Sequence, residues 1–182
     1  MIVQHSAETN EHYTPAPIIR AAWDVMGWID LDPATCERVN RELVGAKHYY
    51  DQESDGLSQI WHGNVWLNPP GGLIDRKSSA AVWWNKLVGE YLSGRIQQAM
   101  FMGFTLEIQR TTQDSTLWIC DLPYCIPRER LDFYQAKEEG GYRVGGAPAH
   151  GNIIAYLPPM NDGLAFIERF ERRFSAFGKV RR

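Results

Sequence analysis

The sequence predicts a single α/β domain with a central mixed β-sheet and flanking helices. In the first half of the chain, strand-like apolar segments alternate with helix-like segments, which is the pattern of parallel strands joined by crossover helices. The last third is richer in strands, which favours an antiparallel edge. A length of 182 residues suits one full domain and is short for two.

The N-terminal part predicts a polar, flexible segment over residues 1–12 and a folded domain over residues 13–182. A helix is expected from Thr14-Pro15-Ala16-Pro17 onward, because Thr is a good N-cap and Pro is tolerated in the first helical turn. The apolar positions spaced for one face of this helix are Ile18, Ala22 and Val25.

Two predicted strands end in polar residues suited to chemistry. The segment 28–34 predicts a short strand that ends in Asp30-Leu31-Asp32-Pro33-Ala34, and the strand 64–67 runs into Asn68-Pro69-Pro70. Two prolines cannot continue a central strand. Ligands of open α/β sheets bind beyond the carboxyl ends of strands, so Asp32 and Asn68 are expected to share one site.

The remaining elements follow from the same periodicities. The expected helices are 35–43, 79–92, 107–114 and a segment from Asp162 onward with Ile167, Phe170, Phe174 and Phe177 on one stripe. The expected strands are 47–51, 99–105, 118–127, 130–134 and 152–158. Residues 71–78 predict a flexible loop, and residues 140–151 a glycine-rich loop.

The overall charge of the chain limits how it can bind a polyanion such as DNA. The net charge of −3 argues against polyanion binding through bulk charge, so contact with phosphate requires a local basic patch. The candidate patches are Arg76 with Lys77, Arg128 with Arg130, and Lys179 with Arg181 and Arg182, each of which is alternatively a solvated surface charge.

Cysteine and histidine spacing gives no indication of a metal. The three cysteines form no Cys-x-x-Cys pair, and the five histidines show no ligand spacing, so neither a disulfide framework nor a metal site is expected. No apolar run approaches the roughly 20 residues that span a bilayer, and the N-terminus lacks signal-peptide features. We therefore expect a cytoplasmic protein that has no membrane partner.

Asn68-Pro69-Pro70 has the groups needed to activate a weakly nucleophilic amine. The lone pair of an adenine amine is delocalised into the ring, and two acceptors on its hydrogens would localise it. The side-chain oxygen of Asn68 and the peptide carbonyl of Pro69 are such acceptors, and the two prolines hold them rigidly. The alternative is that Asn-Pro-Pro-Gly is only a turn. Leu157-Pro158-Pro159 also follows an apolar strand but offers no amide or acid for this chemistry.

Several motifs together resemble the phage-type DNA N6-adenine methyltransferases. They are Tyr13-Thr14-Pro15, Asp30-Leu31-Asp32-Pro33-Ala34, Asp55-Gly56-Leu57 and Trp66-Leu67-Asn68-Pro69-Pro70, in the order and spacing of that family. The similarity continues to about residue 105 and weakens beyond it. It implies a Rossmann-like methyltransferase fold, S-adenosylmethionine as cofactor, double-stranded DNA as partner, a monomer or weak dimer, and a phage or prophage gene expressed in a bacterial host.

The resemblance also implies roles for individual residues. Asn68, Pro69 and Pro70 match the catalytic motif, and Tyr13, Thr14 and Pro15 match the segment beside the methionine end of the cofactor. The acid motif matches the segment that binds the cofactor's amino acid moiety; its residues are Asp30, Asp32, Pro33 and Ala34. Asp55 matches the acid that contacts the cofactor adenine. The alternatives are a helix N-cap for Asp32 and an Asx-turn for Asp55.

One position departs from the family. An aromatic residue usually follows the second proline and stacks on the extruded base, but here Gly71 and Gly72 follow. Candidate substitutes are Trp83, Trp84 and Tyr124, each of which is alternatively a core residue. Segments 71–78 and 137–150 are the expected base-reading elements.

Three hypotheses follow. The first is site-specific methylation of adenine N6 in DNA through base flipping. The second is a weak or inactive methyltransferase relative that binds nucleic acid or cofactor, which Gly71 favours. The third keeps the enzyme but places the acceptor amine or amide on protein or RNA.

Overall fold

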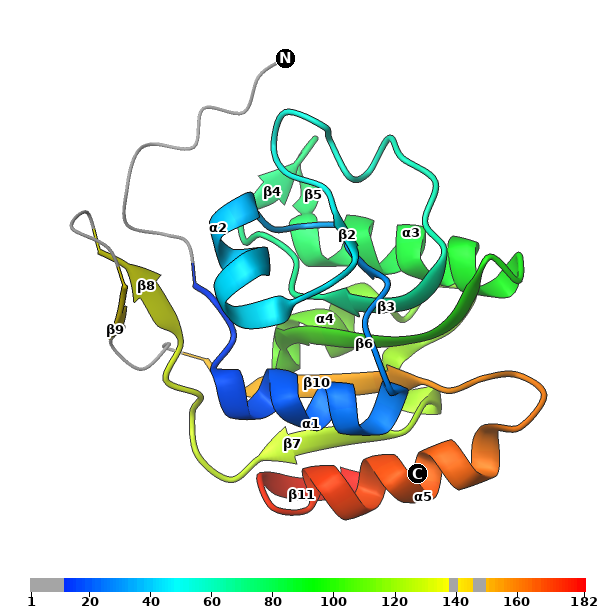
Figure 1. Cartoon of the computed structure of the whole chain (residues 1–182). Helices are drawn as coiled ribbons and strands as arrows, with labels where there is room; N and C mark the ends of the chain where they lie inside the picture. The colour runs from blue at the N-terminus through cyan, green and yellow to red at the C-terminus, as the bar shows by residue number, and fades with distance from the viewer. Residues whose placement is uncertain (1–11, 138–140, 146–149) are drawn as a thin grey trace.

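The computed structural model describes residues 12–137, 141–145 and 150–182. The flexible segment predicted for residues 1–12 therefore falls, except for His12, outside the described residues, as does half of the predicted base-reading segment 137–150. The described chain has an α/β fold in which helices flank a central mixed sheet of seven strands (Figure 1). The predicted architecture is confirmed at this level.

The sheet joins a parallel half to an antiparallel half. In spatial order its strands are β11 (Gly178–Arg181), β7 (Tyr124–Pro127), β10 (Asn152–Leu157), β6 (Ile96–Phe104), β3 (Gly63–Leu67), β1 (Leu31–Asp32) and β2 (His48–Tyr49). Strands β2, β1, β3 and β6 are mutually parallel. Each later pairing, β6 with β10, β10 with β7 and β7 with β11, is antiparallel, which confirms the expected antiparallel edge.

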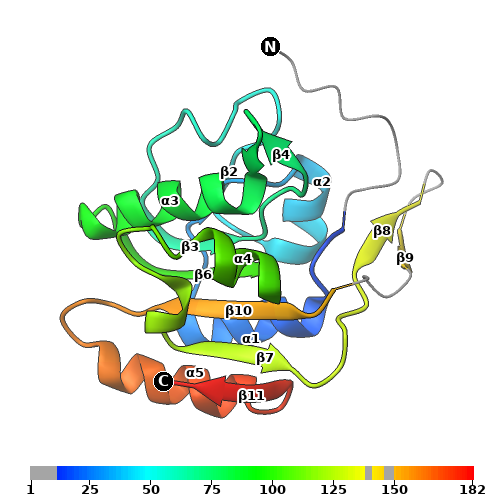
Figure 2. The same cartoon turned by 180° about the vertical axis from the view of Figure 1, so that it is seen from behind.

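Helices cover both faces of the sheet, and strand residues alternate between them. Helices α1 (Ala16–Met26) and α5 (Gly163–Phe174) lie on one face, and α3 (Ser79–Leu92) and α4 (Thr105–Thr111) lie on the other (Figures 1 and 2). We call these the α1 face and the α3 face. Trp66 packs in the core of the α1 face and its neighbour Leu67 in that of the α3 face, as the period of two requires.

Helix α1 begins one residue later than its sequence indicates. Pro15, and not Thr14, occupies the N-cap position, and no side-chain cap is made, so the predicted cap is wrong. Gly27 ends the helix at φ 84°, where a residue without Cβ is favoured. The predicted apolar face is confirmed, because Ile18, Ala22 and Val25 are all buried.

Helix α1 runs antiparallel to the strands that it covers. The carbonyl of Met26, at its C-terminal end, accepts hydrogen bonds from the side chains of Asn64 (3.2 Å) and Gln98 (3.1 Å), which lie near the starts of β3 and β6. The N-terminal end of α1 therefore lies at the opposite edge of the sheet, where the parallel strands finish. We call this the carboxyl edge and the other the amino edge.

Five segments differ from their predictions. The helix expected over 35–43 is a short α2 (Glu37–Val39) that continues as the π-helical turn η1 (Asn40–Val44). The flexible loop expected over 71–78 contains the hairpin β4 (Leu73–Ile74) and β5 (Lys77–Ser78). The segment 118–127 contains a 3-10 turn, η2 (Ile119–Asp121), before β7, and β8 (Tyr134–Ala136) pairs with β9 (Tyr142–Val144). The C-terminal strand β11 was not expected.

Among the described residues, no helix combines the length and apolar character needed to cross a membrane.

Candidate functional site

The strand order changes direction beside β1. From β1 the chain passes to β2 on one side and then returns to β3 on the other, and both neighbours are parallel to β1. Connections that leave in opposite directions open a crevice outside the carboxyl ends of two such strands, which is where open α/β sheets bind ligands. Asp32 is the last residue of β1, and Asn68 follows the last residue of β3.

Asp32 and Asn68 lie on the same face of the sheet. Leu31 and Leu67 both belong to the core of the α3 face, so the residue after each points to the α1 face. Leu31 is level with Val65 in the parallel register, which places Asn68 two residues beyond the level of Asp32. That offset corresponds to roughly 7 Å along the strand direction. The structure therefore brings the two residues to the same face of the sheet at the carboxyl edge.

Asp32 is a buried carboxyl group without a cationic partner. Its exposed fraction is 3 %, and its Oδ1 accepts one hydrogen bond, from the backbone N–H of Ala34 (3.2 Å). Burial raises the pKa of Asp32 to about 7, an effect that the bond from Ala34 only partly offsets. The helix N-cap alternative is wrong, since Cys36 occupies the N-cap position of α2. No ion pair among the described residues involves Asp32.

The turn around Asp55 packs directly on the end of β1. A Cβ at Gly56 would lie 2.0 Å from the carbonyl oxygen of Pro33, so only glycine permits this approach. The Gly56 carbonyl accepts a hydrogen bond from Trp61 Nε1 (2.7 Å), and Trp61 stacks on Trp83 below. The structure thus brings the predicted Pro33 and Asp55 segments together.

Asp55 holds its carboxylate at the surface of this turn. Its φ of 48° is in the left-handed region, and its backbone carbonyl accepts bonds from the Ser58 N–H and hydroxyl. The Asx-turn of the loop belongs to a different residue, Asp51, whose Oδ1 accepts from the N–H groups of Glu53 and Ser54. Within the described part of the chain, the Asp55 carboxylate takes part in no hydrogen bond.

Asn68 is oriented by the N-terminal segment. Its Nδ2 donates to the backbone carbonyl of His12 (3.0 Å), and its Oδ1 accepts no hydrogen bond among the described residues. Asn68 and Pro69 are half-buried, whereas Pro70 and Gly71 are exposed. The turn after β3 therefore lies at the surface and not in the core.

The segment Tyr13-Thr14-Pro15 crosses the carboxyl edge beside Asn68. Tyr13 exchanges backbone hydrogen bonds with Tyr134 of β8, and its ring meets that of Tyr142 edge-on at 6.0 Å. Thr14 is 5 % exposed, and its hydroxyl has no partner among the described residues. A buried hydroxyl without a partner calls for an explanation, and a ligand at this edge would supply one.

Asp30 lies with the amino edge and not with the candidate site. Its carboxylate accepts from the backbone N–H of Asn64 (2.9 Å), from Trp28 Nε1 (2.8 Å) and from Lys47 Nζ (2.7 Å). Burial alone would raise the pKa of Asp30, but these bonds outweigh it and hold that pKa below its usual value. The structure does not group Asp30 with Asp32, Asn68 and Asp55.

Two further polar groups at the carboxyl edge escaped the sequence analysis. The side-chain oxygens of Thr105 and Asn152 are buried and have no partner among the described residues. Asn152 pairs with Phe104 at the end of β6, and the half-buried Phe104 ring meets His150 at 5.6 Å. The available signal was the polar Asn152 at the head of an otherwise apolar strand.

None of the proposed substitute rings replaces the one missing at Gly71. Trp84 is fully buried against Phe101, and Trp83 is buried against Trp61, so core packing explains both. Tyr124 lies on β7, which β6 and β10 separate from β3. The space at Gly71 is open, because a Cβ there would meet no atom within 4 Å.

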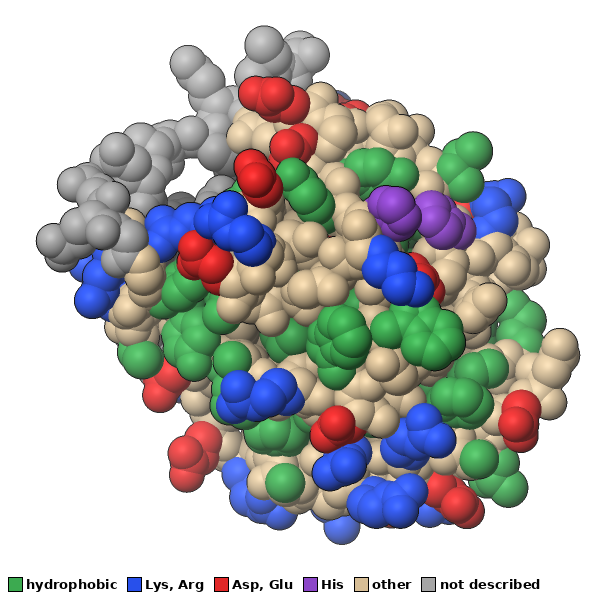
Figure 3. Space-filling model, in the orientation of Figure 1, with side chains coloured by type: hydrophobic (Ala, Val, Ile, Leu, Met, Phe, Trp, Pro, Cys, Tyr) green, Lys and Arg blue, Asp and Glu red, His purple; other side chains and the backbone are tan. Residues whose placement is uncertain are grey.

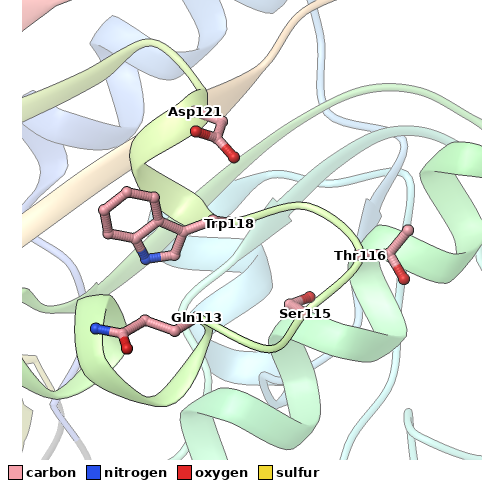
Figure 4. Close-up of a pocket in the computed structure, with 5 residues that line it drawn as sticks. All are labelled: Gln113, Ser115, Thr116, Trp118 and Asp121. Carbon is pink, nitrogen blue, oxygen red and sulfur yellow. The ribbon is translucent and has the colours of Figure 1, made fainter.

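Two hollows on the surface are lined by residues other than Asp32. One is lined by Gln113, Ser115, Thr116, Trp118 and Asp121 (Figure 4). It lies between the end of α4 and η2, and its Trp118 and Ser115 already bond Gln109 and Asn85, so we assign it no role. A second hollow runs between the start of α1 and the segment before β8. No group of three or more His, Cys, Asp or Glu in the described ranges is arranged to hold a metal ion.

Comparison of the chain with models of known protein families and with curated proteins gives no match in either case.

Proposed function

We propose that this chain is an S-adenosylmethionine-dependent DNA methyltransferase that acts on N6 of an extruded adenine. The observation that most strongly supports this proposal is the environment of the Asp32 carboxyl group. It is buried without a cationic partner among the described residues, and it lies where the strand order changes direction, near Asn68-Pro69-Pro70. A buried carboxyl group without a partner costs free energy of folding, and a cationic ligand would recover it. S-adenosylmethionine carries two cationic groups, an α-ammonium and a sulfonium.

The polar groups of the carboxyl edge suit the chemistry of that cofactor. Asp32 would accept hydrogen bonds from the ammonium, and the unpartnered Thr14 hydroxyl would donate to the carboxylate at the same end. Asp55, held against Pro33, would accept from the adenine amine at the other end. The sulfonium, which joins these two parts of the cofactor, would then lie between them and could face Asn68.

Asn68 and Pro69 would prepare the acceptor. Two carbonyl oxygens that accept from the amine hydrogens favour a tetrahedral nitrogen with a localised lone pair. S-adenosylmethionine held by Asp32 and Thr14 would supply an electrophilic methyl group, with its thioether as the leaving group, and the surplus proton on N6 would leave to water. The protein contributes orientation and fixed dipoles, which the Asn68–His12 hydrogen bond and the two prolines provide.

The open position at Gly71 favours a second candidate. A protein that binds cofactor or nucleic acid without transferring methyl groups needs no ring on an extruded base, and no substitute ring lies there among Trp83, Trp84 and Tyr124. Asn68 and the unpaired Asp32 favour the active enzyme, because a binding protein has no need of an acceptor pair at the opening.

Radiolabelled S-adenosylmethionine distinguishes the two candidates. The purified chain is incubated with the labelled cofactor and unmethylated duplex DNA, and the experiment is repeated with RNA and with protein as acceptors. We expect label in DNA as N6-methyladenine. Asn68→Ala should lower the rate by about 100–1000-fold while cofactor affinity stays within about 3-fold.

Asn85→Ala is the matched control, because it also removes an asparagine amide but from α3, where Asn85 bonds Ser115. Its rate should equal that of the wild type. Cofactor binding without transfer to any acceptor would overturn the proposal and support the second candidate.

A further inference from the structure

A small hairpin projects directly after the Asn68-Pro69-Pro70 turn. Strands β4 and β5 pair Leu73 with Ser78 and Ile74 with Lys77 (Figure 2). The hairpin is fixed at its base, where the Ser79 N–H donates to the Gly72 carbonyl (3.0 Å) and the Ser78 hydroxyl donates to Glu107 (2.5 Å). It is therefore a defined projection beside the site opening.

The two strands divide their side chains between the core and the outside. Ile74 packs against the core of the α3 face, whereas Leu73 is 64 % exposed. Leu73 stands only three residues after Pro70, and Gly71 and Gly72 between them add no side chain. The first apolar side chain after Pro70 is thus that of Leu73, and most of it is exposed to solvent.

The turn of this hairpin contains an unusual residue. Asp75 (φ 48°) and Arg76 (φ 66°) both have left-handed backbone conformations, as a two-residue hairpin loop requires. Asn or Asp followed by Gly is the usual choice, and a long side chain at the second position costs free energy that glycine would avoid. Arg76 therefore makes this turn less stable than glycine would at the same position.

Arg76 and Lys77 form an exposed basic pair, and in the described part of the chain neither side chain forms an ion pair or hydrogen bond. The same holds for the side chains of Arg130, Lys179 and Arg181 in the other two predicted patches. By contrast, Arg128 donates to the carbonyls of Ser175 and Ala176 after α5. Arg182 pairs with Glu171. Acidic and basic side chains are interspersed over α5, at the bottom of the face in Figure 3. Of the three predicted basic patches, the hairpin is the one next to Asn68.

We propose that the β4–β5 hairpin is the duplex-DNA contact of this protein, with Leu73 as an apolar wedge and Arg76 and Lys77 on phosphates. The inference rests on the proposed function, because an adenine that leaves the stack creates a gap that an apolar side chain can occupy. Charge complementarity favours DNA over an acidic protein surface, since phosphates flank every base and the wedge needs a gap between bases.

Binding of a fluorescein-labelled duplex, measured by anisotropy with S-adenosylhomocysteine present, tests the phosphate contacts without requiring chemistry. Arg76→Gly should weaken binding by about 3–10-fold at moderate salt and reduce the salt-dependence slope by about one. The same variant relieves the turn, so its Tm should rise by about 2–4 °C, and weaker binding cannot then reflect unfolding. Arg172→Gln, which removes one positive charge from α5, is the control and should bind DNA as the wild type does.

The wedge is tested by comparing a fully paired duplex with one that has an abasic site opposite the adenines. Leu73→Ala should weaken binding to the paired duplex by about 5-fold or more and should have little effect on the abasic duplex, where extrusion costs less. Equal losses on both duplexes would overturn the wedge.

The outcomes separate this inference from the proposed function. Hairpin-dependent DNA binding without methyl transfer supports the hairpin and overturns the chemistry. Methyl transfer to DNA that Arg76→Gly and Leu73→Ala leave unchanged overturns the hairpin and keeps the chemistry. Absence of DNA binding by the wild type overturns the hairpin assignment outright.

Discussion

Two aspartates at the two ends of the shortest central strand have opposite surroundings. Asp30, at the amino edge, accepts hydrogen bonds from Lys47, Trp28 and the Asn64 N–H, and its pKa is lowered. Asp32, two residues later at the carboxyl edge, is more deeply buried and accepts one bond from Ala34, and its pKa is raised to about 7. Lying next to β1 therefore does not by itself determine whether an aspartate finds partners.

The contrast extends along both edges of the sheet. At the amino edge, Asn64 and Gln98 donate to α1, and the Tyr156 hydroxyl donates to Gln98; the Asn64 Oδ1 is the exception without a partner there. At the carboxyl edge, Thr14, Thr105 and Asn152 hold buried oxygens without partners in the described chain. Most polar groups named at the amino edge are paired within the protein, whereas these three at the carboxyl edge are not.

The largest expected effect is on the pH dependence of stability. Because the folded-state pKa of Asp32 is raised from 3.8 to about 7, the folded state binds a proton more tightly than the unfolded chain. The contribution of Asp32 is complete below pH 3.8 and is lost as pH rises to about 7, by about 4 kcal/mol in total.

Urea unfolding of the wild type and of Asp32→Asn across pH 4–8 measures this contribution by difference, which removes the other carboxylates from the comparison. The variant should gain stability relative to the wild type as pH increases. A difference that stays constant with pH would show that Asp32 is not held in a costly environment.

The counterpart at the other end of β1 should behave in the opposite way. Asp30→Asn removes charge-assisted hydrogen bonds to Lys47 and its neighbours and should cost about 1–3 kcal/mol of unfolding free energy at pH 7. Affinity for S-adenosylmethionine, measured by calorimetry on the folded variant, should remain within about 2-fold. A loss of cofactor affinity as large as that of an Asp32 variant would contradict this prediction, because Asp30 would then contribute to the cofactor site.

The smallest expected effect concerns the open position after the prolines. Gly71 has room for a side chain, since its Cβ would meet nothing within 4 Å. Gly71→Tyr should add a ring that stacks on the extruded base, worth about 1 kcal/mol or roughly 5-fold in kcat/KM for DNA. Gly71→Val, which adds bulk without a ring, is the control. An equal gain with valine would contradict stacking.

The polar residues at the strand ends could be predicted from the sequence, but the hydrogen-bond partners of those residues could not. Asp32 and Asn68 follow from a short apolar run stopped by proline, and the ligand edge follows from parallel order. The difference between Asp30 and Asp32 requires the register that places Asn64 and Lys47 beside only one of them.

Other features escaped prediction for local reasons. The hairpin after Gly72 lacks the glycine that normally marks a two-residue turn, because Arg76 stands there. Strand β11 follows α5 after only three residues, and Phe177 continues the apolar stripe of that helix in sequence although it lies outside it.

The most direct measurement pairs cofactor affinity with thermal stability in Asp32→Asn at pH 8. The substitution keeps the shape and the Oδ1 acceptor for Ala34 but removes the buried charge. The account predicts a Tm several degrees above that of the wild type, together with a loss of at least about 10-fold in affinity for S-adenosylmethionine. A variant that is less stable and binds the cofactor as tightly as the wild type would contradict it, because Asp32 would then be a structural residue like Asp30.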